Sequence, residues 1–330
     1  MTRFRFCAGL GVCLLAVSLF FHGTPETGPS QAQAWQGQAA NALARVMQIP
    51  DRNAARLMQN KDVVGTATGV SRGRAVIKVY TVRAGVAGIP RNVEGVPVVI
   101  EVTSRFFAKP RGGNGGGNGG NGGGKPPKDP PADEVDPKSK FALPVPIGVS
   151  IGNENSCSAG TISCRLNGGT LLLSNNHVIA LENAAPIGGD PDNILQPGLF
   201  NTNCKSATNT AIGVFFDHVE IEFSTSASNT VDAAIATTDA ILVDDATPAD
   251  GYGKPKSTII APSLSMNVQK YGRTTNLTTG QISGINATVN IGYSNGTARF
   301  VNQIIVSGNG GRIYQGRGFR FVVGREWRRG

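Results

Sequence analysis

Residues 171–180 read LLLSNNHVIA, a leucine run that stops at a Ser-Asn-Asn segment and is followed by a histidine. A short apolar run bounded by turn residues predicts a buried β-strand. A side chain placed directly after such a strand can project into a cleft rather than into the core. We therefore take His177 as a candidate functional residue. The alternative is a polar side chain that only caps the bend.

The sequence around this stretch has the same β character. Residues 141–311 consist of short β-type runs separated by Gly, Asn, Asp and Pro, with almost no helical periodicity. Clear examples are GTISCRL, AIGVFF, VEIEFS, MNVQKYG and ATVNIGYS. Many short strands joined by turns predict an all-β barrel or sandwich. We expect this region to be one folded domain.

A smaller α+β domain is expected over residues 35–109. The pattern from Trp35 to Lys61 has helical spacing and is interrupted by Pro50, which predicts two short helices. The runs VVGTATGV, RAVIKVYTV and VPVVIEVTSRFF then predict strands. Residues 110–140 are a Gly/Asn tract followed by a charged, Pro-rich segment, a composition typical of a linker.

Residues 1–34 have the layout of a secretory signal peptide. Arg3 and Arg5 precede an apolar stretch over residues 6–21, and the segment ends in Ala-Gln-Ala. We expect export to the periplasm or the cell exterior, with no membrane insertion once the signal is removed. The alternative is an uncleaved anchor.

Removal of the signal leaves three cysteines, Cys157, Cys164 and Cys204. In an oxidising compartment they imply one disulfide and one free thiol. Cys157 and Cys164 could close a small loop, and Cys204 could equally pair with either of them.

The formal net charge is +9, but the charge is unevenly placed. Residues 141–311 contain 7 Lys and Arg against 12 Asp and Glu, so this region is acidic. The basic excess lies in residues 1–140 and in the Arg-rich segment 312–330. Within residues 141–311 no Lys/Arg run with interleaved aromatic residues occurs, so we expect no nucleic-acid partner.

A histidine that acts as a base needs a carboxylate at its far ring nitrogen to fix its tautomer and orientation. Asp232 stands in the apolar run VDAAIA, where an unpaired carboxylate would be costly to bury. Asp217 beside His218 is the rival pair, but its segment alternates like a solvated strand. His22 lies in the predicted signal peptide.

Two motifs of this region resemble those of trypsin-like serine proteases. LSNNHVIA is similar to the histidine motif of that family, and VDAAIA is similar to its aspartate motif. The segments CSAGTISCRL, ALENAAPIGG, ILQPGLF, SNTVDAAIA and YGRTTNLTTGQISGI resemble the bacterial members related to the plant narrow-leaf protein. Apart from the linker, the resemblance covers residues 60–311.

The resemblance implies a chymotrypsin-like fold, a double antiparallel β-barrel with the catalytic triad between the barrels. It implies that His177 is the general base, that Asp232 orients it, and that the substrate is a peptide or protein. The third member would be a serine within Gly-Asp-Ser-Gly, whose backbone N–H groups form the oxyanion hole. No cofactor is implied. No metal site is expected either, because His177 and His218 fit no zinc-binding spacing.

The Gly-Asp-Ser-Gly motif is absent from the chain. Ser307 in VSGNGG lacks the preceding acidic residue, so we do not assign it as the nucleophile. Residues 312–330 have no family resemblance and stand where the second barrel should be completed. We therefore expect a peptidase fold with an incomplete second barrel that is inactive as written. The alternative is a secreted binding or scaffold protein, in which residues 35–109 dock a partner; these residues could also act as a propeptide or inhibitor.

Our hypothesis for the missing motif is a shifted reading frame. Codons that encode residues 313–323 can, when read one base later, spell Phe-Ile-Lys-x-Gly-Asp-Ser-Gly-Ser-Leu. We predict a frameshift in the coding DNA close to Gly311. Sequencing the gene from codon 305 to the next stop codon checks this: a second frame that encodes Gly-Asp-Ser-Gly and further strands supports the frameshift, and a frame without the motif refutes it.

Overall fold

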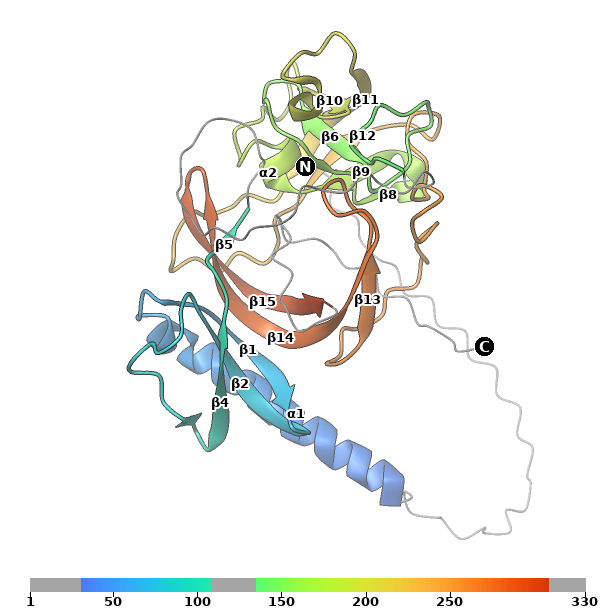
Figure 1. The fold of residues 1–330 in the computed structure, drawn as a ribbon. Coiled ribbons are helices and arrows are strands. Elements are labelled where there is room, and N and C mark those ends of the chain that lie inside the picture. Colours follow the sequence, from blue (N-terminus) through green and yellow to red (C-terminus); the bar gives the residue numbers. More distant parts are fainter. Residues whose placement is uncertain (1–30, 109–134, 309–330) are drawn as a thin grey trace, which may run out of the picture. The chain divides into compact units, whose positions relative to one another are not determined.

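The computed structural model describes residues 31–108 and 135–308, and this part of the chain is mainly β. Its strands form one sheet of seven strands and one of eight (Figure 1). The described helical segments are α1 (Gln31–Leu57), the single turn α2 (Asn176–Ile179) and the 3₁₀ turns η1 (Asn167–Gly169) and η2 (Leu199–Thr202). The mainly-β fold class predicted from the sequence is confirmed.

The seven-stranded sheet has the order β7-β6-β10-β11-β12-β9-β8, with antiparallel pairing throughout. Its strands are β6 (Ser150–Asn153), β7 (Gly160–Thr161), β8 (Cys164–Leu166), β9 (Leu171–Ser174), β10 (Asn193–Gln196), β11 (Thr210–His218) and β12 (Ala234–Thr237). The leucine run forms β9: Leu172 is fully buried in the aliphatic core, whereas Leu171 and Leu173 are half-buried. This alternation is that of a strand with one face on the core.

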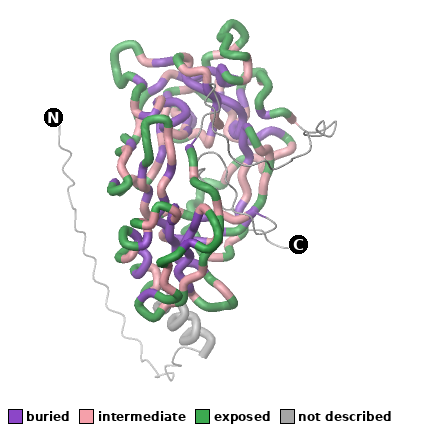
Figure 2. The backbone as a smooth tube through the Cα atoms, turned by 60° about the vertical axis from the view of Figure 1, so that its left-hand side comes forward, coloured by how far each residue is buried: buried purple, intermediate pink, exposed green. Residues whose placement is uncertain are grey.

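The eight-stranded sheet has the order β13-β14-β1-β2-β4-β3, and β15 and β5 also pair with β14. Its strands are β1 (Val63–Ser71), β2 (Arg74–Thr81), β3 (Asn92–Val93), β4 (Val96–Val102), β5 (Phe106–Phe107), β13 (Asn267–Lys270), β14 (Thr278–Tyr293) and β15 (Gly296–Gly308). The two long strands β14 and β15 form a hairpin with Ser294 and Asn295 at its turn. β1 and β2 are mostly buried, whereas β4 has no fully buried residue; Figure 2 shows how buried and exposed stretches alternate along the chain.

Strands from both sides of the linker share this second sheet. β1 pairs antiparallel with β14, with Gly65 opposite Val289. A Cβ atom at Gly65 would lie 2.9 Å from the backbone oxygen of Thr288, so only glycine allows this close approach. Val64 of β1 and Phe300 of β15 belong to one buried cluster. The predicted boundary between residues 35–109 and 141–311 therefore does not separate two sheets, because hydrogen bonds and core both cross it.

The helical region was predicted as two helices separated by Pro50, and this prediction is wrong. One helix, α1, continues through Pro50. Proline removes one backbone hydrogen bond from a helix. Burial outweighs this loss: Ile49 and Leu57, on either side of Pro50, pack with Ile77 and Val79 of β2 in a common core cluster.

The disulfide joins Cys157 to Cys204, with Cα atoms 5.1 Å apart and a sequence separation of 47. Cys164 is the free thiol. Of the pairings that the sequence leaves open, the structure selects the longer loop, which ties the segment after β6 to the segment after η2.

Several predicted segments lie outside the described residues: 1–30 of the signal peptide, 109–134 of the linker region and the Arg-rich residues 312–330.

The last part of the predicted linker, residues 135–140, is bound to the folded chain. Asn276 Nδ2 donates to the backbone oxygen of Val135 (3.1 Å), and Gln196 Nε2 donates to that of Ser139 (2.8 Å). None of the described helices is long and apolar enough to cross a membrane.

We predict that Phe300→Ala lowers the protection of backbone amides against exchange in β1 and β2 as well as in β14 and β15, because residues of all four strands pack in one core. Loss of a fully buried phenylalanine should cost about 3–5 kcal/mol of unfolding free energy. Amide hydrogen exchange measures the effect strand by strand. Ile259→Ala, at a side chain that is 95% exposed, is the control and should change stability little. Unchanged exchange in β1 and β2 would show that residues 63–81 fold independently.

Candidate active site

His177 and Asp232 are brought together by the pairing of β9 with β12. Ser174, the last residue of β9, lies opposite Ala234, the first residue of β12. When this antiparallel register is extended past both strands, Asp232 falls beside the start of α2, which carries His177. The Ser-Asn-Asn segment ends the strand and begins this helical turn. The two predicted site residues therefore lie together.

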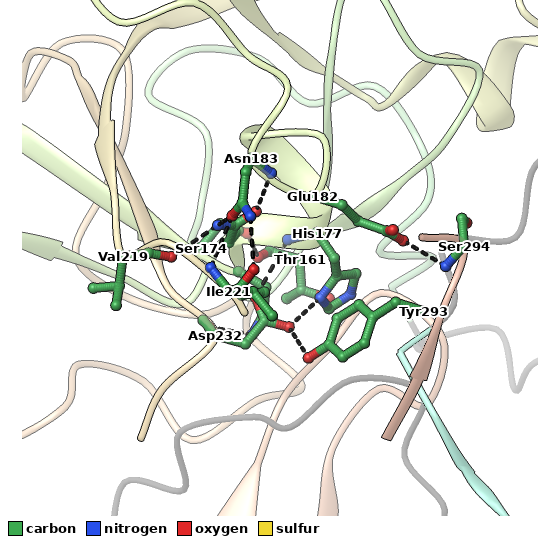
Figure 3. A network of polar contacts seen from close by, with 12 residues as sticks. Thr161, Ser174, His177, Glu182, Asn183, Val219, Ile221, Asp232, Tyr293 and Ser294 are labelled. Atoms are coloured by element: carbon green, nitrogen blue, oxygen red, sulfur yellow. Dashed lines mark hydrogen bonds and ion pairs between the residues drawn. The ribbon is translucent and has the colours of Figure 1, made fainter. Parts of the chain in front are cut away.

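The contact between these two residues is short and has two points (Figure 3). The Nδ1 atom of His177 lies 2.5 Å from Oδ2 of Asp232. The backbone N–H of His177 donates to the other carboxylate oxygen, Oδ1, at 3.2 Å. Asn175 Nδ2 donates to the backbone oxygen of Asp232 at 2.8 Å, which fixes the main chain at that residue. Ring and carboxylate thus have one defined relative orientation.

The second asparagine of the motif holds α2 in place. The Nδ2 group of Asn176 donates to the backbone oxygen of Val219 (2.8 Å) and to the side-chain oxygen of Asn183 (2.7 Å). Asn183 in turn donates from Nδ2 to the backbone oxygen of Ile221 (2.8 Å). Because Asn176 is fully buried, these bonds satisfy a side chain that would otherwise be costly to bury. The pair of asparagines is the local scaffold of the histidine.

A third side chain reaches the pair from the other sheet. Tyr293, the last residue of β14, donates its hydroxyl hydrogen to Oδ2 of Asp232 at 3.1 Å. Its ring lies edge-on to the imidazole of His177, with centroids 6.1 Å apart and planes at 70°. We did not predict this residue from the sequence. The strand ATVNIGYS and the turn after it were recognisable, but nothing local shows which distant residue the tyrosine meets.

Burial governs the electrostatics of the site. The side chains of His177 and Asp232 are only 3% and 1% exposed. Burial by itself raises the pKa of the Asp232 carboxyl, but attraction to His177 and the hydrogen bonds from His177 and Tyr293 outweigh it and lower that pKa below its ordinary value. Burial, followed by the negative charge of Asp232, raises the pKa of the Tyr293 phenol far above its ordinary value, so the hydroxyl stays a neutral donor.

The other residues considered from the sequence, Asp217, His218 and Ser307, are not part of the His177–Asp232 contact. Asp217 is exposed near the end of β11, and its Oδ1 accepts the backbone N–H of His218 at 2.7 Å. Within the described chain, Nδ1 of His218 has no hydrogen-bond partner. Ser307 lies opposite Gln281, near the other end of the β14–β15 hairpin from Tyr293, and donates to Ser283 Oγ (2.7 Å).

Over residues 31–108 and 135–308, no three His, Cys, Asp or Glu side chains gather in a group that could hold a metal ion. The His177–Asp232 geometry is compatible with proton transfer at the imidazole. When Nδ1 carries the proton directed at Asp232, the lone pair of the neutral imidazole lies on Nε2. That nitrogen can accept a proton, and the adjacent carboxylate stabilises the imidazolium that results.

No protein-family model matches the sequence, and no curated protein matches it either. Among solved structures, the chain is similar to a glutamic acid-specific serine protease, with 19% identity and a TM-score of 0.29 over 51% of this chain and 76% of that one. It is also similar to Cellulomonas bogoriensis chymotrypsin (19% identity, TM-score 0.31, 51% and 74% covered). A third similar structure is a Nocardiopsis protease (17% identity, TM-score 0.30, 49% and 71% covered). Since these scores are low, we base the function on side-chain geometry.

The lowered pKa of Asp232 predicts an acid-sensitive contribution to stability. The folded state binds the Asp232 proton less tightly than the unfolded chain, whose aspartate pKa is about 3.9. Its contribution is therefore present above about pH 4 and is lost as the pH falls toward the lower pKa of the folded state. Urea unfolding between about pH 2 and 6 should show a shallower loss of stability in Asp232→Asn than in the unmodified chain. Asp217→Asn, at an exposed carboxylate, is the control and should keep the full loss; equal slopes in all three proteins would contradict the prediction.

Proposed function

We propose that His177 and Asp232 are the base and the orienting carboxylate of a trypsin-like serine endopeptidase. The observation that carries this proposal is the two-point contact of buried Asp232 with the Nδ1 atom and the backbone N–H of His177. A carboxylate at Nδ1 holds the imidazole in the tautomer whose Nε2 atom can take a proton from a serine hydroxyl. The sequence resemblance to bacterial relatives of the plant narrow-leaf protein points to the same activity.

The reaction would be hydrolysis of a peptide bond. His177 would accept the proton of the serine as its oxygen attacks the carbonyl carbon and would then return it to the leaving amine. Asp232 would keep its charge and stabilise the imidazolium between these two transfers. The serine and the N–H donors of the oxyanion hole would come from the Gly-Asp-Ser-Gly segment that the shifted reading frame can encode.

The chain as written lacks that segment and is proposed to be inactive. A base and its carboxylate have nothing to activate without a nucleophile and oxyanion donors. The signal-like residues 1–34 support export, so we place the parent enzyme in the periplasm or outside the cell.

A non-catalytic secreted binding protein is the second candidate. The absence of Gly-Asp-Ser-Gly from all 330 residues favours it. In that case the His177–Asp232 pair would be retained only as a buried structural contact, and residues 35–109 would belong to the binding surface.

A fluorophosphonate probe distinguishes the two candidates, because it reacts with a serine only when a base activates it. We predict that the protein with its reading frame restored is labelled, that His177→Ala abolishes the labelling, and that Asp232→Asn lowers it by about 10³–10⁴-fold. The 330-residue chain itself should remain unlabelled. His218→Ala is the matched control and should keep full labelling. Absence of labelling in the restored protein would favour the binding protein.

A further inference from the structure

The carboxylate of Asp232 is held by donors from two different sheets. Its Oδ2 atom accepts from Nδ1 of His177 (2.5 Å) and from the Tyr293 hydroxyl (3.1 Å), and its Oδ1 atom accepts from the His177 backbone (3.2 Å). A carboxylate can rotate about its Cβ–Cγ bond, and its torsional preference is broad. The backbone bond and the tyrosine together leave one rotation in which Oδ2 faces the ring nitrogen.

The turn that follows Tyr293 is clasped by a buried carboxylate. Glu182 is 7% exposed, and its two oxygens accept the backbone N–H groups of Ser294 (3.0 Å) and Asn295 (2.9 Å). The clasp comes from the segment directly after α2, where Leu181, Glu182 and Asn183 all have positive φ angles of 55°, 55° and 76°. Three successive residues in this region are unusual and need surrounding contacts to persist. The turn is therefore hydrogen-bonded to the residues that directly follow α2, the helical turn that contains His177.

Aromatic packing fixes the ring of Tyr293 from its other sides. Phe223 lies edge-on to it with centroids 5.5 Å apart, and Phe300 is stacked on it at 6.1 Å. The ring of His177 faces Tyr293 edge-on, and, besides burial, the groups that raise the pKa of the tyrosine hydroxyl are the two acidic residues Asp232 and Glu182. They favour the neutral phenol, which therefore acts as a hydrogen-bond donor.

We propose that Tyr293, the last residue of β14, is a positioning residue for His177. The hydrogen bonds from Ser294 and Asn295 to Glu182, the Glu182 clasp, hold the turn after Tyr293 in place. The tyrosine acts through Asp232: its hydroxyl fixes the carboxylate and partly neutralises the charge that the imidazole faces. Through this contact, a residue of the eight-stranded sheet orients the carboxylate that faces a histidine held by the seven-stranded sheet. The catalytic meaning of this role rests on the proposed peptidase function, but the effect on His177 does not.

The test is the pH titration of the His177 ring, followed by NMR in the full 330-residue chain. Tyr293→Phe keeps the ring packing and removes one hydroxyl dipole whose positive end points at Asp232. The carboxylate should then attract the imidazolium more strongly, and the midpoint of the His177 titration should rise by roughly half a pH unit. Tyr271→Phe is the matched control: Tyr271 is also buried, and its hydroxyl donates to Asp250 at 2.9 Å, but it lies outside the His177–Asp232 pair. It should leave the midpoint unchanged.

An unchanged midpoint in Tyr293→Phe, or an equal shift in Tyr271→Phe, overturns the proposal. If Tyr293→Phe does not fold, Tyr293→3-fluorotyrosine decides the question, because it retains the hydroxyl and makes it a stronger donor. The midpoint should then move downward, and no movement overturns the proposal. The probe labelling of the restored protein is a separate measurement. If the restored protein is not labelled but Tyr293→Phe shifts the His177 midpoint, the peptidase is rejected and the positioning role is kept. If the restored protein is labelled but the midpoint does not shift, the positioning role is rejected and the peptidase is kept.

Discussion

A charged carboxylate buried at Asp232 is the constraint on which the site depends. Such a group is tolerated only when it is paired and its lone pairs are satisfied. His177 supplies two of the donors and Tyr293 the third, and each comes from a segment whose path is fixed by further buried polar contacts. The asparagines of the histidine motif and the Glu182 clasp are those contacts. Stability and a defined site geometry therefore have the same physical origin.

The same contacts join the two sheets. His177 and Asp232 are carried by the β9–β12 pairing, whereas Tyr293 ends a strand whose neighbours include β1, from the region before the linker. The sheet that presents the tyrosine is thus built from residues that are far apart in the chain. This sheet reaches the aspartate segment at more than one point, because Tyr293 bonds the carboxylate and Gln303 of β15 bonds the backbone oxygen of Thr230.

Sequence reasoning succeeded where the signal was local. The leucine run and the polar turn after it identified the strand and the histidine, and the aspartate in an apolar run could be chosen because burial of an unpaired charge is costly. It failed at Pro50, where packing of Ile49 and Leu57 on β2 carries one helix through a residue that usually ends helices. Sequence reasoning also placed a domain boundary at the linker. A flexible linker of that composition does not prevent strands before and after it from pairing in one sheet.

The sequence by itself determined the mainly-β class and the strand before His177, because strand alternation is a property of short segments. It also made Asp232 the preferred partner of that histidine, through the cost of burying an unpaired charge and through the family resemblance. Tertiary structure decided the disulfide partner, the sharing of one sheet by β1 and β14, and the presence of Tyr293 at the carboxylate. Each of these joins residues that are far apart in the chain. Such contacts depend on how whole sheets pack and on their register, and no local pattern encodes them.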